Sequence, residues 1–418
     1  FVVGKMDCPI HPRDRLNVHE CHRWEPKIPE KPNEITAFSL TSGESKARCQ
    51  IVPLYYVKVM HDIILKALGI VEIFPFGNLS SIESVRIVLH DSVTDEEVTS
   101  AHFKTVQGIQ LNGFLYKPVQ ALHLPKGYEF TISVEIPSKM NWRCSSTVAP
   151  AHTMYQMNTL ETKQNHYQLV YIELLDRDDT VLISDKNAVF LSAASFMFSV
   201  HDIPTLGRHI AAIPERAISW QEEINKVAAW LEDEASLHGD VITVDVVDVY
   251  RNLPQKVLLC QTWFHEMYNP SFLMKTDDDC YVNLPTILKM LPEQETDRGV
   301  WWGNFRQNWA VERHGKWREI DFSSSVYPKF ACGSGYVVSK NISLWLYNNQ
   351  YMLRKFQGED VSTGIWLSGL DISYLQDDRW QCAMTCQDDA FSIPELTAEM
   401  ISWHWNNSKY CPSPCSVC

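Results

Sequence analysis

Three consecutive carboxylates, Asp277, Asp278 and Asp279, are the residues whose types and spacing most clearly suggest chemistry. They follow a short apolar run at residues 272–274, which is typical of a buried strand. Because clustered charges are costly to bury without partners, we expect something positive beside them. A hard divalent cation that carries phosphate oxygens fits, since such ions use one or two protein carboxylates. The alternative is a solvated acidic turn.

A second acidic pair, Glu359 and Asp360, precedes a segment with helical character at residues 362–370. One interpretation is structural, because the helix dipole stabilises acidic residues at a helix N-terminus. The functional interpretation makes Asp360 a general base that takes a proton from an acceptor hydroxyl. One acidic site on a metal and another on a hydroxyl suit group transfer from a nucleotide donor.

Between the two acidic sites lies the segment Gly333-Ser334-Gly335. Its glycines allow a close approach that side chains would forbid, although a tight turn into a strand at 336–339 would also explain them. Aromatic residues are dense upstream, and they suit sugar faces, although a buried core is their commoner role. These aromatic residues are Trp301, Trp302, Phe305, Trp309 and Trp317.

Strands and helices alternate after residue 191, which predicts an α/β domain with a mostly parallel sheet. We expect strands at 195–200 and 241–244 and helices at 220–235 and 253–266. The spacing of the first helix places Ile224, Val227, Ala228 and Leu231 on one face. Ligands of such sheets sit beyond the carboxyl ends of the strands, where the acidic triplet would lie. This placement favours the metal interpretation.

Residues 37–190 have a different character and are mostly β-like. The segments 84–90 and 128–136 alternate apolar and polar residues with period two, which indicates half-buried antiparallel strands. A β-sandwich inserted into the α/β domain is the natural interpretation. We therefore divide the chain into an N-terminal part of the α/β domain (1–36), the insertion (37–190) and the main α/β domain (191–418).

The composition describes a folded protein with 418 residues, 45% hydrophobic and 21% charged. Its length favours two domains, or one domain with a large insertion. A net charge of −14 argues against nucleic acid as a partner. No apolar stretch of about 18 residues is present, so nothing here should span a membrane. The opening residues 1–4 look like the tail of a strand, so we expect an upstream segment that holds any signal or membrane anchor.

Twelve cysteines and three glycosylation sequons, at Asn78, Asn341 and Asn406, favour an oxidising secretory compartment. Five of the cysteines lie in the last 37 residues. A zinc knuckle is the rival interpretation of that cluster. Because no two Cys-x-x-Cys pairs face each other at finger spacing, we predict disulfides, with a connectivity that spacing alone does not give.

Four motifs in order resemble those of the inverting β1,3-glycosyltransferase family, glycosyltransferase family 31. The resemblance covers residues 191–418 and, more weakly, 1–36. The motifs are Asp245-x-x-Asp248-x-Tyr250-x-Asn252-Leu253-x-x-Lys256, Lys275-Thr276-Asp277-Asp278-Asp279, Tyr327-Pro328 with Gly333-x-Gly335-Tyr336, and Glu359-Asp360-Val361. The tryptophan-rich segment at 301–317, Cys280 and the β-rich insertion are most similar to members that transfer N-acetylgalactosamine.

The resemblance implies a GT-A-type nucleotide-sugar-binding domain and a manganese ion. Asp279 matches the direct metal ligand and Asp360 the catalytic base. Asp277 and, less securely aligned, His404 are further candidate metal ligands, and a packed or surface histidine is the alternative for His404. The remaining implied contacts are Asp278, Lys256, Gly333, Ser334 and Gly335 for the donor, and Trp302 and Glu359 for the acceptor. Lys256, Asp248 and Tyr250 are as consistent with bracing the fold as with contacting the donor.

By this resemblance the chain would transfer N-acetylgalactosamine from its UDP donor, β1,3, to a terminal N-acetylglucosamine. The implied acceptor is an O-mannosyl glycan on a glycoprotein of the dystroglycan type. The implied location is the lumen of the endoplasmic reticulum or Golgi, as a single-pass type II membrane protein.

Transfer of galactose or N-acetylglucosamine is the alternative within the family, since one acetamido pocket separates these donors. A catalytically inactive carbohydrate-binding protein is the alternative from another class. Its motivation is that the family's first strand and the basic helix after it have no counterpart before Phe1. The insertion itself could be lectin-like, a spacer or a homodimer surface.

Overall fold

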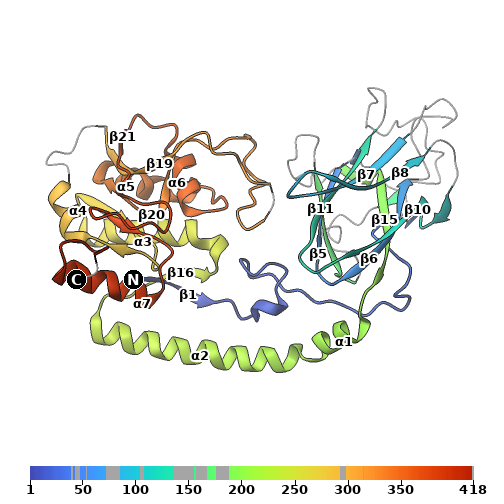
Figure 1. Ribbon diagram of the computed structural model, residues 1–418, viewed down its shortest axis with the longest axis horizontal. Helices are drawn as coiled ribbons and strands as arrows, with labels where there is room; N and C mark the ends of the chain where they lie inside the picture. Colours follow the sequence, from blue (N-terminus) through green and yellow to red (C-terminus); the bar gives the residue numbers. More distant parts are fainter. Residues whose placement is uncertain are drawn as a thin grey trace.

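The protein folds into two lobes that lie side by side in Figure 1. This computed structural model describes residues 1–38, 41–42, 48–52, 54–71, 85–103, 108–135, 155–156, 167–175, 188–291, 298–313 and 315–416. One lobe is built from two antiparallel β-sheets, and the other combines helices with a smaller sheet. The architecture is thus mixed α/β, with several sheets that are mostly antiparallel.

The β lobe contains two five-stranded sheets whose described pairings are all antiparallel. The first has the order β2 (Ile35–Thr36), β15 (Ala194–Val200), β6 (Ile63–Val71), β10 (Phe114–Leu124) and β9 (Ile109–Leu111). The second has the order β13 (Val170–Leu175), β5 (Leu54–Val59), β11 (Glu129–Glu135), β7 (Val85–Asp91) and β8 (Glu97–Phe103). Side chains from both sheets line one hydrophobic cluster, so each sheet buries one face against the other.

Short strand pairs accompany these sheets. β3 (Thr41–Ser42) pairs with β12 (Tyr155–Gln156), and β4 (Arg48–Val52) pairs with β14 (Ala188–Ser192). The strands predicted at 84–90 and 128–136 are present as β7 and β11. Their apolar residues face the core that the two sheets share, which explains the alternation in the sequence.

The strand predicted at 195–200 exists as β15, but it does not belong to the α/β lobe. β15 pairs with β2 and β6 and buries Phe196 and Phe198 in the core of the β lobe. Its nearly continuous apolar sequence is typical of a strand that is covered on both faces. Such a sequence does not indicate to which sheet the strand belongs. The alternation of strands and helices was predicted to begin at residue 191. The chain, however, leaves the β lobe only after Val200.

The α/β lobe has a four-stranded sheet in the order β17 (Phe272–Lys275), β20 (Phe330–Ser339), β19 (Val300–Arg306) and β21 (Ser373–Gln376). The β17–β20 and β19–β20 pairings are antiparallel, and only β19–β21 is parallel. The prediction of a mostly parallel sheet is therefore wrong for these strands. For β19 and β20 the reason is that no helix lies between them among the described residues, and parallel neighbours need a crossover connection.

Further pairings complete this lobe. β1 (Val2–Asp7) is parallel to β16 (Ile242–Asp248), and β18 (Tyr281–Val282) pairs with β22 (Ser392–Ile393). The helices of the lobe are α3 (Leu253–Tyr268), α4 (Leu284–Met290), α5 (Lys340–Asn349), α6 (Glu359–Leu367) and α7 (Ala398–Tyr410). Short 3₁₀ helices span Pro12–Asp14, Tyr250–Asn252 and Gln350–Met352. β1 thus brings the first residues of the chain beside a strand more than 230 residues later.

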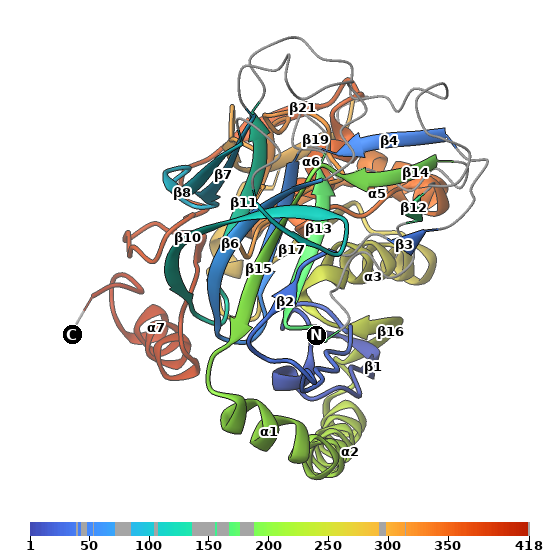
Figure 2. The ribbon, with the colours of Figure 1, turned by 90° about the vertical axis from the view of Figure 1, so that its right-hand side faces the viewer.

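Two helices connect the lobes, α1 (Ile203–Ala211) and the long α2 (Ile213–His238). Figures 1 and 2 show α2 running along the outside of the molecule. The helix predicted at 220–235 lies within α2, but its apolar face is not buried, since no residue of α2 is buried and Val227 is 42% exposed. Arg216 holds α2 to Asp14 through two hydrogen bonds, so polar contacts rather than a packed face attach this helix. None of the described helices has both the length and the apolar character needed to cross a membrane.

Disulfides are present, as predicted, both near the start of the chain and in its C-terminal part. Cys8 is bonded to Cys21, Cys332 to Cys382, and Cys386 to Cys415. Cys411 is also disulfide-bonded, whereas Cys260 and Cys280 are free. The bridge between Cys332 and Cys382 fixes the middle of β20 to the segment that follows β21.

A buried ion pair joins the lobes. Arg318, in the loop between β19 and β20, pairs with Glu173 on β13, and the two side chains are 14% and 4% exposed. The Arg318 guanidinium also stacks over the Tyr56 ring of β5 at 4.3 Å. Beside them, the Gly315 amide donates to the Glu129 carboxylate at 3.2 Å. This loop is therefore anchored on the outer face of the second sheet.

Removing one partner of this ion pair should destabilise the contact between the lobes. We expect Glu173→Gln to lower the free energy of unfolding by about 3–5 kcal/mol, because it leaves a buried guanidinium without a counter-charge. Urea unfolding followed by tryptophan fluorescence measures the change. The exposed Glu96→Gln is the matched control. A Glu173→Leu/Arg318→Leu double variant should recover most of the loss, and a Glu173→Gln protein as stable as the parent would contradict the assignment.

Candidate active site

The acidic triplet follows β17, whose last residue is Lys275. β17 pairs with β20 along one side, and Lys275 lies opposite Tyr336 in this pairing. The Asp277 side chain is 40% exposed, and Asp278 and Asp279 are exposed. The triplet therefore lies at the carboxyl end of a sheet strand, with one carboxylate partly covered and two open to solvent.

Lys275 connects the triplet to the second acidic pair. Its Nζ lies 2.6 Å from Asp277 Oδ1, makes an ion pair with Glu359 Oε1 and donates to the Gly333 carbonyl at 2.9 Å. Only 10% of the Lys275 side chain and 4% of the Glu359 side chain are exposed. Tyr336 donates a further hydrogen bond to Glu359 Oε2 at 3.2 Å. One buried cation thus gathers carboxylates that are 82 residues apart in the sequence.

The electrostatics of this cluster follow from one lysine among several acids. Burial raises the pKa of Glu359 to about 7, with Asp360 and Asp277 adding to burial and Lys275 opposing it. Burial alone would lower the pKa of Lys275, but Glu359 and Asp277 raise it above its ordinary value. Lys275 therefore remains charged, and the cluster holds an excess of negative charge.

Asp360 lies beside this cluster, in the first turn of α6. Its Oδ1 accepts a hydrogen bond from the Val361 amide at 2.8 Å. Gly358 is the N-cap, and the bond from the Val361 amide is a contact that the structural interpretation of Asp360 at a helix N-terminus also expects. Burial raises the pKa of Asp360, an effect that Asp277 increases and that Lys275 and Arg306 oppose. A carboxylate with a raised pKa is a better proton acceptor, as a general base requires.

The glycine segment on β20 lies against the same cluster. A Cβ on Gly333 would come within 3.2 Å of Asp277 Oδ2, so a side chain there would crowd the carboxylate. Ser334 is buried, and its hydroxyl accepts from Ser392 Oγ at 3.3 Å. A Cβ on Gly335 would meet the Trp380 ring at 2.7 Å. Of the predicted donor contacts in this segment, Gly333 lies nearest the carboxylates, while Ser334 and Gly335 face packed neighbours.

The structure separates two other predicted contacts from the cluster. Lys256 Nζ binds both oxygens of Asp248, at 2.8 and 3.0 Å, and Asp248 accepts from the Gly4 amide at 2.7 Å. This arrangement favours the bracing interpretation, since it ties α3 to the β1–β16 pair. Trp302 is only 4% exposed and packs edge-on against Trp380 and Phe391, so it is a core residue here.

His404 lies on α7 and is 5% exposed. Its Nδ1 is 2.9 Å from the Pro414 carbonyl, and its ring lies beside Tyr281. Among the described residues, no three His, Cys, Asp or Glu side chains are gathered so that they could hold a metal ion. The arrangement therefore supports the packed-histidine alternative for His404.

Exposed oxygen ligands are nevertheless available for a hard cation. Asp278 and Asp279 make no ion pair with any described cation, and the Asp279 backbone is fixed by a hydrogen bond from the Leu396 amide at 2.9 Å. Carboxylate oxygens are the preferred ligands of such ions, which complete their coordination with substrate phosphates and water. The residues present therefore fit a metal that arrives together with a phosphorylated donor.

Sequence reasoning named Lys275 within a motif but gave it no role. A lysine that ends an apolar strand two residues before an acidic run was the available signal. Tyr250 was predicted either to brace the fold or to contact the donor. Burial is the main cause that raises the pKa of Tyr250, and Asp360 and Asp277 raise it further, so this residue lies near the acids. Of the sequons, Asn341 and Asn406 are exposed on α5 and α7, and Asn78 lies outside the described residues.

Comparison with known proteins identifies relatives of this chain. The family model described as galactosyltransferase matches residues 220–378, which include both acidic segments. The chain is 31% identical to UDP-GalNAc:β-1,3-N-acetylgalactosaminyltransferase 2 of Xenopus laevis, over 100% of this chain and 83% of that protein. The human protein of the same name is 31% identical over 99% of this chain and 81% of its own length. Mouse β-1,3-galactosyltransferase 6 is 36% identical over 36% of this chain and 47% of that protein.

Lys275 should be essential for the stability of the acidic cluster. We expect Lys275→Met to lower the free energy of unfolding of the α/β lobe by about 3–5 kcal/mol, since it leaves a buried carboxylate unpaired. Thermal unfolding monitored by circular dichroism measures the loss, with the exposed Lys289→Met as control. Adding Glu359→Gln to Lys275→Met should restore part of the stability. If Lys275→Met unfolds at the parent temperature, the lysine does not hold the cluster together.

Proposed function

This chain belongs to the galactosyltransferase family and is a hexosyltransferase, and we propose that it transfers N-acetylgalactosamine from UDP-GalNAc to a glycan. The proposed linkage is β1,3 and the proposed acceptor is a terminal N-acetylglucosamine. Similarity over the whole chain to N-acetylgalactosaminyltransferases supports this donor. The observation that carries the proposal is that Asp360 lies close enough to Asp277 and Lys275 to interact with their charges. A carboxylate with a raised pKa would then lie next to the acidic segment that we propose to hold a metal ion.

Asp360 is the proposed general base. It would take the proton of the acceptor hydroxyl, and that oxygen would form a bond to the anomeric carbon of the donor sugar. The bond from the anomeric carbon to the UDP oxygen breaks in the same step, so an α-linked donor gives a β-linked product. Burial raises the pKa of Asp360, which suits a group that must accept a proton during attack. Glu359 and Lys275 hold the start of α6 and the triplet in place, and so act as positioning residues.

A divalent cation, which we propose to be manganese, would be held by Asp279 with help from Asp277 and Asp278. When bound, it would neutralise the charge that develops on the departing UDP phosphates. Asp277 is already paired with Lys275, which makes the exposed Asp279 the better candidate for direct contact. His404 is not needed in this assignment, since substrate oxygens can complete the coordination.

The acceptor and the location are further parts of the proposal. An O-mannosyl glycan on a glycoprotein of the dystroglycan type is the acceptor implied by the resemblance. Three disulfides between described cysteines and two exposed sequons support a lumenal location, the endoplasmic reticulum or Golgi. The proposed form there is a single-pass type II membrane protein. Galactose transfer is a second candidate, favoured by the similarity of part of the chain to a β-1,3-galactosyltransferase.

Donor preference tests the proposed activity directly. We expect the full chain to transfer sugar from UDP-GalNAc to a soluble acceptor ending in N-acetylglucosamine, because the acetamido group should gain contacts that galactose lacks. Rates with UDP-GalNAc, UDP-galactose and UDP-N-acetylglucosamine, together with nuclear magnetic resonance of the product linkage, decide the question. Turnover with UDP-galactose alone would replace the first candidate with the second, and no turnover with any donor would favour a carbohydrate-binding role.

Two conservative substitutions should separate the base from the metal ligand. Asp360→Asn should lower kcat by about 10²–10⁴, since an amide cannot accept the proton. Asp279→Asn should instead raise the manganese concentration needed for half-maximal activity by about tenfold or more. Initial rates against metal concentration, after removal of metal with a chelator, measure both effects.

Asp371→Asn is the matched control, because the Asp371 side chain is 79% exposed and pairs with Arg298 on the surface. Full activity of the parent protein in excess chelator would remove the metal from the proposal. Unchanged rates in Asp360→Asn would remove Asp360 as the base.

A further inference from the structure

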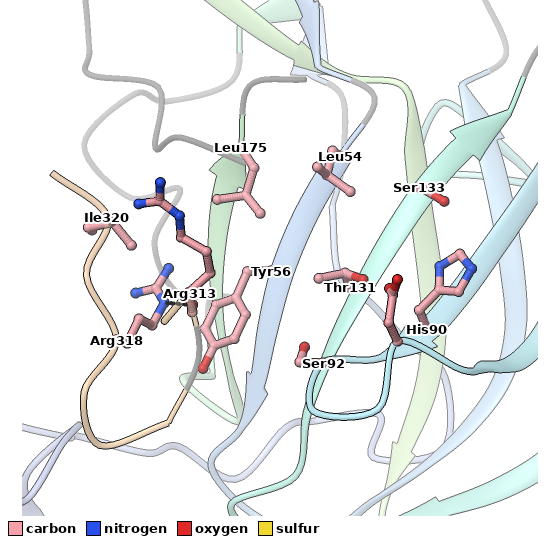
Figure 3. Close-up of a pocket in the computed structure, with 11 residues that line it drawn as sticks. Leu54, Tyr56, His90, Ser92, Thr131, Ser133, Leu175, Arg313, Arg318 and Ile320 are labelled. Atoms are coloured by element: carbon pink, nitrogen blue, oxygen red, sulfur yellow. Dashed lines mark hydrogen bonds between the residues drawn. The ribbon is translucent and has the colours of Figure 1, made fainter. Parts of the chain in front are cut away.

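A cavity lined by polar and apolar side chains lies between the two lobes, beside the Glu173–Arg318 ion pair. Its volume is about 330 Å³, which falls at the lower end of the range for ligand pockets. It is lined by Leu54, Tyr56, His90, Ser92, Asp95, Thr131, Ser133, Leu175, Arg313, Arg318 and Ile320. Figure 3 shows Arg313 and Arg318 on one side of Tyr56, with Ser92, Thr131 and His90 on the other.

The floor of the cavity is the outer face of the second sheet. Tyr56, Thr131 and His90 occupy one row across β5, β11 and β7. Ser133 is opposite Leu54 in the row where Leu175 also lies. Since alternate residues of these strands, such as Val57 and Ile132, lie in the core, the floor residues necessarily face outward.

The wall of the cavity is the loop of the α/β lobe that carries Arg313 and Arg318. Arg313 donates to the carbonyls of Glu319, Phe322 and Ser324 at 2.7, 2.9 and 3.0 Å, which fixes its position. Unlike Arg318, it makes no ion pair with a carboxylate among the described residues. The loop thus presents one guanidinium whose charge is not balanced by a neighbouring acid.

Ser92 points to a ligand. It is 8% exposed, and its hydroxyl is buried with no hydrogen-bond partner among the described residues. A buried hydroxyl without a partner costs free energy, and here it belongs to a residue that lines a cavity. A ligand hydroxyl in the cavity would supply the missing partner.

The charges of the lining select a neutral ligand. The charge of Arg318 is balanced by Glu173, which leaves Arg313 and Asp95 as one cation and one anion. An anionic ligand would be opposed by Asp95 and a cationic one by Arg313. A molecule that carries several hydroxyls can donate to the carboxylate and accept from the guanidinium, while Leu54, Leu175 and Ile320 offer apolar contacts. A sugar ring has this combination of polar rim and apolar face.

The cavity wall also continues toward the candidate active site. Lys316, in the same loop, lies 4.9 Å from the ring of Tyr250. Tyr250 is close enough to Asp360 for the two to interact electrostatically. A ligand in the cavity would therefore contact a loop whose other side faces the transfer site.

We propose that this inter-lobe cavity binds one residue of a neutral glycan, through Ser92, Thr131 and Arg313, at a site separate from the transfer centre. The choice of a sugar as ligand rests in part on the proposed function, whereas the cavity and its unpartnered hydroxyl do not. Binding here would add a second attachment point for a glycan and would hold the lobes together.

Binding of simple sugars to the full chain tests this proposal. The probes are methyl α-mannoside, methyl β-galactoside and methyl β-N-acetylglucosaminide, and saturation-transfer difference nuclear magnetic resonance measures their affinity. We expect at least one probe to bind, with affinity at least tenfold lower in Ser133→Trp, which fills the cavity from β11. His102→Trp is the matched control, because His102 is exposed on β8 and does not line the cavity.

Ser92→Ala distinguishes a ligand contact from a structural role. Because the Ser92 hydroxyl has no partner in the described residues, its removal should leave the melting temperature unchanged or higher. Sugar affinity should nevertheless fall about threefold to tenfold, the effect of one lost hydrogen bond. A lower melting temperature with unchanged affinity would assign Ser92 a structural role and overturn the proposal.

The remaining outcomes are also decisive. The proposal is overturned if none of the three sugars binds, or if Ser133→Trp binds as tightly as the parent. Tenfold tighter binding of mannose 6-phosphate than of mannose would overturn the proposal that the ligand is neutral. Transfer from UDP-GalNAc to a short soluble acceptor, measured on the same variants, should stay within twofold of the parent. Loss of sugar binding with intact transfer would thus separate failure of this site from failure of the proposed function.

Discussion

The active-site lobe depends on one buried cation. Lys275 ends a strand, and its ammonium group contacts Asp277, Glu359 and the Gly333 carbonyl. These partners come from the loop after β17, from the first turn of α6 and from β20. Without the lysine, burial of Glu359 among other acids would be too costly, and the two acidic motifs would repel each other. Strand pairing and hydrophobic packing bring β17, β20 and α6 together, and charge compensation by Lys275 allows their acidic residues to lie at this junction.

A similar constraint joins the lobes, where Arg318 enters the outer face of the β lobe and pairs with Glu173. Its guanidinium also covers Tyr56, so a loop of the α/β lobe becomes a wall on the second sheet. Both buried cations sit at boundaries, one between secondary-structure elements and one between lobes. Such pairs contribute little net stability compared with apolar packing, but they fix which surfaces meet. The cavity beside Arg318 is a consequence of this polar boundary.

The sequence predicted the local elements better than their partners. Alternation of apolar residues located β7 and β11, and helical spacing located α3, because these signals are local. Residues 195–200 were predicted as a strand, yet their sheet was misassigned, since a doubly buried strand carries no mark of its neighbours. Helical spacing also located α2, but it does not show what covers its apolar face: Ile224 and Leu231 are only half-buried, because the helix lies outside both lobes. The order of the motifs pointed to Asp360 and the triplet as site residues. The structure adds that Lys275 lies between the two acidic segments and pairs with Asp277 and Glu359.

The exposure of Asp278 and Asp279 carries a consequence for the order of binding. A site completed by protein ligands alone would hold its cation permanently, whereas two exposed carboxylates leave most coordination positions to water or phosphate. Lys275 already neutralises one charge of Asp277, so the attraction for a free cation is weaker than three adjacent aspartates suggest. A donor with two phosphates supplies both more oxygen ligands and more negative charge. If the proposed cation and the nucleotide donor bind here, we therefore expect them to bind cooperatively, each raising the affinity for the other by the same factor.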